Sequence, residues 1–233
     1  MIAYMQKLTL LDYPGHLASI LFTTGCNMGC PWCHNLSLVE GELLKDRSEA
    51  EYIAYLTYIK SFLKKREGIL DGVVITGGEP TIHAGLPMLI GSIKALGYDV
   101  KLDTNGTNPD MIEALLNDNA VDYVAMDLKN SPDRYVMTCG RPNLDLSPIY
   151  KTIRLLHESN VDHEFRTTVV GEFHDDSSIE AIASMVDGPD KFVLQAYRGT
   201  LFFTPTTDDL ARYRAILESH GHTVESRGTW VKV

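Results

Sequence analysis

Three cysteines stand within eight positions of a chain that contains only one other. Cys26, Cys30 and Cys33 lie in the stretch GCNMGCPWCHN, and the fourth cysteine, Cys139, is far away in the sequence. A structural zinc site needs four ligands, and His34 directly follows a cysteine, which makes tetrahedral closure difficult. The spacing favours an iron–sulfur cluster held by thiolates, with one iron left open to a small molecule.

Short β-rich runs alternate with amphipathic stretches along the whole chain. Strands are predicted over 18–24, 72–78, 99–106, 121–129, 163–170 and 191–199, and helices near 48–67, 84–97, 109–119, 147–159, 177–187 and 207–221. This alternation predicts parallel strands with crossover helices. Six such units are too few for an eight-fold barrel of about 250 residues, so we expect one α/β domain over 1–233, a partial, open (β/α)6 barrel. The turn residues of DYPG (12–15) predict a short N-terminal β extension that includes a hairpin.

The unusual residues lie where the predicted strands end. The cysteine loop follows the first strand, TGGEP (76–80) the second, DTNG (103–106) the third, DLK (127–129) the fourth and QAYRG (195–199) the sixth. All strand C-termini of a parallel barrel open on one face, and ligands bind there. We therefore expect these five polar clusters to converge.

Together these motifs resemble those of the radical S-adenosylmethionine (SAM) enzymes. The Cys-x3-Cys-x2-Cys pattern, with Trp32 before its last cysteine, and TGGEP carry the likeness. Within that superfamily CHN (33–35), LDTNG (102–106) and MDLK (126–129) resemble the activases of glycyl-radical enzymes. The opening 7–35 most resembles the activating proteins of anaerobic ribonucleoside-triphosphate reductase.

The resemblance implies a [4Fe–4S] cluster that cleaves SAM reductively to a 5′-deoxyadenosyl radical, which takes hydrogen from a glycine of a partner glycyl-radical enzyme. That partner would be anaerobic ribonucleotide reductase, with flavodoxin or ferredoxin as electron donor. One alternative is a small-molecule enzyme similar to 7-carboxy-7-deazaguanine synthase, against which CHN, DTNG and MDLK argue. The other is a zinc-binding module without catalytic activity.

The resemblance also implies residues that bind SAM. Gly77 and Gly78 would approach its amino group while Glu79 orders their loop, Asn35 would contact SAM, and Trp32 would lie beside the adenine. Each residue has a structural alternative. GGEP can be a plain strand-to-helix turn, Asn35 an Asx turn and Trp32 an ordinary buried tryptophan.

A second group is implied around the carboxylate and ribose of SAM, namely Asp103, Thr104, Asp127 and Lys129. Carboxylates and backbone carbonyls also suit a small hard cation, so a bound Na⁺ or K⁺ is expected at Asp103, Thr104, Ala125 and Asp127. The alternatives are a cap at Asp103 and an ordinary ion pair between Asp127 and Lys129.

Three later residues complete the expected site. Arg166 could reach Glu79 or the SAM carboxylate by a bidentate contact, and Gln195 and Tyr197 match adenine-side positions of the family. Cys139 is expected to be a small buried or loop residue and not a ligand.

Charge and composition argue against some classes of binding partner. Lys and Arg total 21 against 31 Asp and Glu, and the net charge of −10 repels phosphate backbones and anionic membranes. We expect no nucleic-acid or membrane partner. The N-terminus lacks a secretory signal and no stretch approaches the length of a membrane span, so a cytoplasmic location is expected. The basic segment 61–68 is either a solvated helix end or a docking site for an acidic electron donor.

Overall fold

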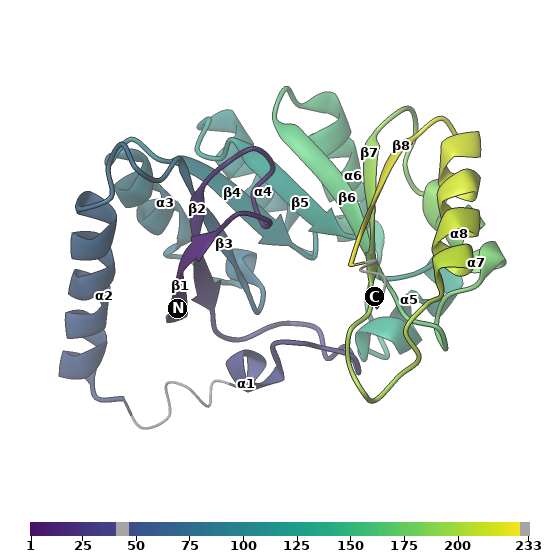
Figure 1. Ribbon diagram of the computed structural model, residues 1–233, viewed down its shortest axis with the longest axis horizontal. Coiled ribbons are helices and arrows are strands. Elements are labelled where there is room, and N and C mark those ends of the chain that lie inside the picture. The colour runs from purple at the N-terminus through teal and green to yellow at the C-terminus, as the bar shows by residue number, and fades with distance from the viewer. Residues whose placement is uncertain (41–46, 229–233) are drawn as a thin grey trace. The chain divides into compact units, whose positions relative to one another are not determined.

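The computed structural model describes residues 1–40 and 47–228 (Figure 1). The chain forms two compact units. The first consists of Met1–Asn27, Asn35–Thr104 and Asp110–Val124, and the second of Met28–His34, Asn105–Pro109 and Ala125–Val233. Strand order in the sheet follows the chain, from β1 to β8. No helix of the described ranges is long and apolar enough to cross a membrane.

The first unit holds the N-terminal strands and their helices. Its elements are β1 (Ile2–Thr9), β2 (Ala18–Thr23), α1 (Leu36–Val39), α2 (Glu49–Lys64), β3 (Gly72–Gly77), the 3₁₀ turn η2 (Pro80–Ile82), α3 (Leu86–Lys94), β4 (Asp99–Thr104) and α4 (Pro109–Asn117). β1 pairs antiparallel with β2, which confirms the predicted β extension. β2, β3 and β4 pair in parallel.

Local sequence explains these elements. Val73, Val74 and Ile75 of β3 are completely buried, as the strands of a parallel sheet covered on both faces should be. Ser48 caps α2 in a capping box with Glu51, which satisfies backbone donors at the start of the helix.

The second unit holds the remaining elements. They are α5 (Pro132–Cys139), α6 (Ser147–Glu158), β6 (Asp162–Val169), α7 (Asp176–Ala183), β7 (Lys191–Ala196), α8 (Thr207–Ser219) and β8 (Thr223–Arg227), together with the end of β5 (Tyr123–Asp127). β6, β7 and β8 pair in parallel. Figure 1 shows α7 and α8 side by side next to β8.

The α/β class with an open, mostly parallel sheet is confirmed, and the six predicted strands coincide with β2 to β7. The sequence prediction missed β8 and α5. In β8 only Val224 is buried, while Arg227 reaches the completely buried Glu164 with two hydrogen bonds of 2.8 and 2.9 Å. Because an ion pair replaces apolar packing there, the hydrophobic pattern of a strand is absent.

Candidate active site

The predicted motifs of the first unit meet at one edge of its sheet. β2 and β3 run parallel, with Thr23 opposite Gly77, and β4 continues the same parallel arrangement. Cys26 follows β2, the GGEP turn follows β3, and β4 ends at Thr104. The cysteine loop therefore begins beside the ends of the two neighbouring strands.

Gly77 and Gly78 allow the GGEP turn to lie directly against the residue before Cys26. Gly77 has φ of +112°, and a Cβ there would lie 2.5 Å from the backbone nitrogen of Thr23. A Cβ on Gly78 would lie 1.8 Å from the carbonyl oxygen of Gly25. The backbone N–H of Glu79 donates to that same oxygen at 2.8 Å. The glycines therefore have a packing role at the cysteine loop, whatever they contribute to SAM binding.

Two further side chains hold the start of the loop. The Asn35 amide donates from Nδ2 to the carbonyl of Gly77 at 3.1 Å, so Asn35 binds the GGEP turn and makes no side-chain cap of α1. His83 donates from Nε2 to the carbonyl of Thr24 at 2.8 Å. The sequence analysis missed His83, because a single histidine after a predicted turn carries no signal of its own.

Glu79 is buried and orders the loop, as expected. Its carboxylate accepts from the backbone and hydroxyl of Thr81, at 3.0 and 2.5 Å, and from the hydroxyl of Thr104 at 2.8 Å. Thr104 thus connects the end of β4 to the turn after β3. Asp103 forms an ion pair with Lys101, whose side chain is almost completely buried.

Asp127 lies at the centre of a charged group in the second unit. It accepts from Arg166 Nε at 2.6 Å on Oδ1 and from Lys129 Nζ at 2.8 Å on Oδ2. Burial alone would raise the pKa of Asp127, but the charges of Arg166 and Lys129 and their hydrogen bonds hold it well below its usual range. All three side chains are less than one-fifth exposed, so this is no ordinary surface ion pair.

Lys129 also lies in the electrostatic field of Cys30. Burial would lower its pKa, but the charge of Asp127, followed by that of Cys30, raises it above its usual value. Metal ligation requires a thiolate, and a neighbouring cation favours that anion. Lys129 is therefore suited to support the Cys30 end of the cysteine loop.

Trp32 anchors Met28–His34 in the second unit. It is buried with Val170 and Tyr197, and its ring centroid lies 5.0 Å from that of Phe173. His34 stacks on Tyr197 with centroids 5.4 Å apart. Trp32 and Tyr197 thus belong to one buried aromatic cluster, and His34 gains a packing role that the sequence did not indicate.

Cys139 is buried at the end of α5, as expected, and its backbone carbonyl contacts the cysteine loop. Its carbonyl accepts from the N–H of Gly29 at 2.8 Å, within the cysteine loop. Gly140 has φ of +66°, and a Cβ there would lie 2.3 Å from the carbonyl of Gly29. Of the other predicted residues, Ala125 is completely buried on β5 and Gln195 is half-buried on β7.

The donor set fits an iron–sulfur cluster. Cys26, Cys30 and Cys33 are free thiols of intermediate exposure, in a loop whose flanks are held by the GGEP turn and by α5. The described ranges contain no gathered group of three or more His, Cys, Asp or Glu side chains ready to hold a metal ion. The cluster assignment therefore depends on the cysteine motif and on the family.

The family is shown by comparison. Residues 20–186 match the sequence profile of the Radical SAM superfamily, and the chain belongs to that superfamily. Membership implies a [4Fe–4S] cluster and SAM. A radical SAM methyltransferase from Sphaerobacter thermophilus shares the fold, with a TM-score of 0.70 and 19% identity over 93% of this chain and 68% of that one.

Activating enzymes are among the relatives that match over most of this chain, which confirms that resemblance. The chain is 34% identical over 201 residues to the putative glycyl-radical enzyme activating enzyme MJ1227 of Methanocaldococcus jannaschii, covering 84% of this chain and 80% of that protein. The pyruvate formate-lyase-activating enzyme of Staphylococcus aureus is 25% identical over 83% of this chain and 79% of its own length. The 7-carboxy-7-deazaguanine synthase of Aquifex aeolicus is 34% identical, but over only 36% of this chain and 33% of its own.

Proposed function

We propose that this radical SAM enzyme takes a hydrogen atom from a glycine residue of a partner glycyl-radical enzyme. The observation that carries this proposal is the extent of the similarity. It covers at least four-fifths of both chains for MJ1227, whereas the deazaguanine synthase shares about a third. When bound, the cluster and SAM supply a 5′-deoxyadenosyl radical.

The chain's own residues would hold and orient these groups. Cys26, Cys30 and Cys33 would ligate the cluster through three thiolates and leave one iron for SAM. Lys129 has three donors and gives one of them to Asp127, so its ammonium can also bind the carboxylate of SAM. Asp127 would then orient the ammonium without contacting the carboxylate of SAM.

The more specific partner is anaerobic ribonucleoside-triphosphate reductase, which the opening segment 7–35 supports. Flavodoxin or ferredoxin would supply the electron.

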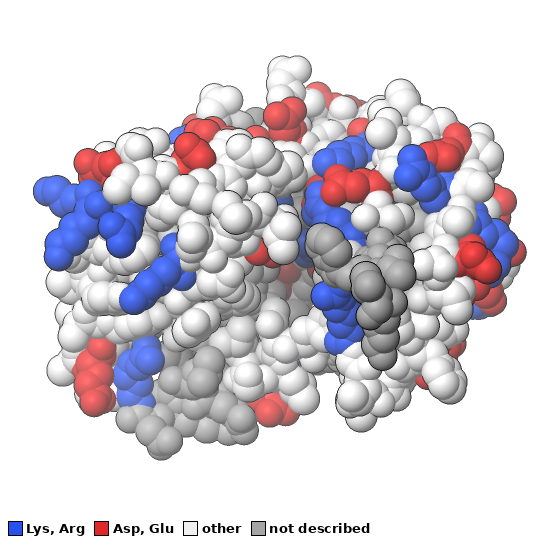
Figure 2. Space-filling model, in the orientation of Figure 1, with Lys and Arg blue, Asp and Glu red and all other residues white. Residues whose placement is uncertain are grey.

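Figure 2 shows blue side chains over the C-terminal end of α2, where Lys60, Lys64, Lys65 and Arg66 are exposed. Because α2 leads into the start of β3 while Cys26 follows the end of β2, this basic patch lies at the opposite strand edge. The solvated-helix alternative therefore suits it better than donor docking.

A Na⁺ or K⁺ ion bound through Asp103, Thr104, Ala125 and Asp127 is part of the proposal. Asp103 and Asp127 already pair with cationic side chains, so an added cation would have to compete with them. SAM affinity measured in sodium, potassium and choline salts at equal ionic strength tests this point. Equal affinities in all three salts would refute the cation.

Anaerobic reconstitution tests the function. We expect iron and sulfide in a four-to-four ratio, SAM cleavage with dithionite, and a glycyl-radical signal by electron paramagnetic resonance (EPR) on a reductase from the same genome. Cys30→Ala should abolish cluster and cleavage together, and Asp127→Ala should keep the cluster but weaken SAM binding. Bound zinc without iron would refute the radical SAM reaction in this protein. Cleavage without a radical on any glycyl-radical partner would favour a small-molecule substrate.

A further inference from the structure

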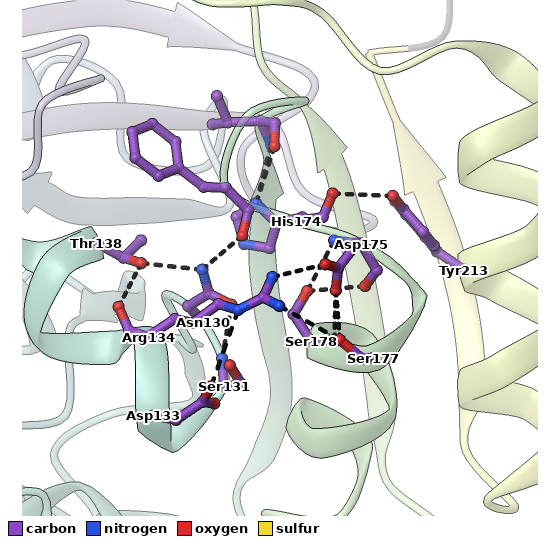
Figure 3. Close-up of polar contacts among 12 residues, drawn as sticks. Asn130, Ser131, Asp133, Arg134, Thr138, His174, Asp175, Ser177, Ser178 and Tyr213 are labelled. Carbon is purple, nitrogen blue, oxygen red and sulfur yellow. Dashed lines mark hydrogen bonds and ion pairs between the residues drawn. The ribbon is translucent and has the colours of Figure 1, made fainter.

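His174 lies in the turn between β6 and α7 and is almost completely buried (Figure 3). Its Nε2 is 3.0 Å from the carbonyl of Lys129, and its Nδ1 is 3.1 Å from the backbone N–H of Val170. A carbonyl can only accept, so Nε2 donates to Lys129, while Nδ1 faces both the N–H and, at 3.2 Å, the carbonyl of Val170. Burial lowers the pKa of His174 although the carbonyls of Lys129 and Val170 oppose this, which agrees with a neutral ring that keeps its proton on Nε2 and accepts from the Val170 N–H at Nδ1.

Asn130, the residue after Lys129, is hydrogen-bonded to the same turn. Its side chain is completely buried, and Nδ2 donates to the carbonyl of Phe173 at 2.9 Å and to the hydroxyl of Thr138 at 2.9 Å. Its Oδ1 accepts from the N–H of Ser131 at 2.7 Å. The amide of Asn130 therefore has partners on three sides, and the segment after Asp127 has little freedom to move.

The other side of the turn contacts the cysteine loop. The ring of Phe173 lies 5.0 Å from that of Trp32, and the His174 ring meets Trp32 edge-on at 6.4 Å. From α8, the hydroxyl of Tyr213 donates to the carbonyl of His174 at 3.0 Å. The turn that carries Phe173 and His174 thus contacts both the backbone of Lys129 and the ring of Trp32 in the cysteine loop.

We propose that His174 and Asn130 are positioning residues, which fix the Lys129 ammonium relative to the Cys30–Cys33 segment. They would act through Lys129 and Trp32 without touching SAM or the cluster. This inference rests on the proposed site, because it assigns Lys129 to the carboxylate of SAM. Replacing residues that orient the ligands of a metal changes metal affinity or activity by about 10- to 100-fold, and we expect a change of that order in SAM affinity here.

The first test uses the protein without its cofactors. Hydrogen exchange is measured on peptides that cover 28–34 and 127–131 in wild type, His174→Ala and Asn130→Asp. We expect faster exchange in both segments for each variant. The control is His222→Ala, because His222 is also buried but bonds to Ala183 and Asp190 instead. It should destabilise the protein and leave these two segments as protected as the rest of the second unit.

The second test measures the reduced cluster by EPR as SAM is titrated. We expect His174→Ala to raise the SAM Kd about tenfold or more and to change the SAM-bound spectrum. His174→Gln keeps a donor able to reach the Lys129 carbonyl, and should recover most of the affinity. Unchanged exchange and unchanged SAM titration in His174→Ala would overturn the inference, as would the same changes in His222→Ala. Neither readout involves a partner enzyme, so failure to activate one would count against the proposed function alone.

Discussion

Replacing Gly78 by Ala should displace the start of the cysteine loop. The added Cβ would lie 1.8 Å from the Gly25 carbonyl oxygen and 2.7 Å from its carbon, where ordinary contacts begin at 3.4 Å. The obstacle is backbone, so no side chain can rotate away. Gly25 must retreat by well over an ångström, and it carries Cys26 with it.

The cost follows from two effects. Overpacking of a close-packed site costs about 1–3 kcal/mol. The hydrogen bond from the Glu79 N–H to the Gly25 carbonyl would lengthen or break, at a further cost of about 1 kcal/mol. We therefore expect Gly78→Ala to lower the free energy of unfolding by about 2–4 kcal/mol. Gly78 is the better test than Gly77, whose positive φ would add backbone strain.

Gly91→Ala provides the matched control. Gly91 lies within α3, and a Cβ there meets nothing within 4 Å. The same substitution should stabilise the protein by about 0.5–1 kcal/mol, because alanine loses less backbone entropy in a helix.

Urea unfolding of the proteins without cofactors measures these differences, and iron content after anaerobic reconstitution measures the displaced cysteine. We expect Gly78→Ala to bind less iron than Gly91→Ala. A Gly78→Ala protein with wild-type stability and wild-type iron content would refute the packing role of this glycine.

Three further predictions concern the electrostatics and the packing of the second unit. Burial would raise the pKa of the N-cap Asp175, but hydrogen bonds from the first turn of α7 and from an arginine lower it to about 2. Wild type should therefore exceed Asp175→Asn in free energy of unfolding by about 0.5–1 kcal/mol above about pH 4, and this difference should fade toward pH 2. A difference in unfolding free energy that does not change with pH would contradict this. Arg227→Met leaves the buried Glu164 with Lys191 at 3.6 Å as its cationic partner, and should lower the free energy of unfolding by about 3 kcal/mol in chemical denaturation. Adding Glu164→Gln to Arg227→Met should restore part of that loss. Equal stability of the single and the double variant would disprove the pairing. Trp32→Phe should leave the SAM Kd unchanged and cost less than the 3–5 kcal/mol of Trp32→Ala, whereas a weaker Kd at unchanged stability would favour an adenine contact.

The elements were predictable where the local pattern was strong. The apolar runs that became β3 and β7 are buried on both faces, and such runs are visible without any tertiary information. β8 was missed because Glu225 and Arg227 meet charges of the neighbouring strands. α5 was missed because the segment 132–139 has only eight residues, too few turns for an apolar periodicity to stand out.

By itself, the sequence determined the cysteine motif and its resemblance to the family, because the spacing of three thiols within eight positions is a property of the chain alone. Only the tertiary structure decided which charges and rings meet around that loop. Asp127 pairs with Arg166 across 39 positions, and His174 binds the carbonyl of Lys129 across 45. Such contacts depend on strand register and on how the turns pack, and the local pattern of residues encodes neither.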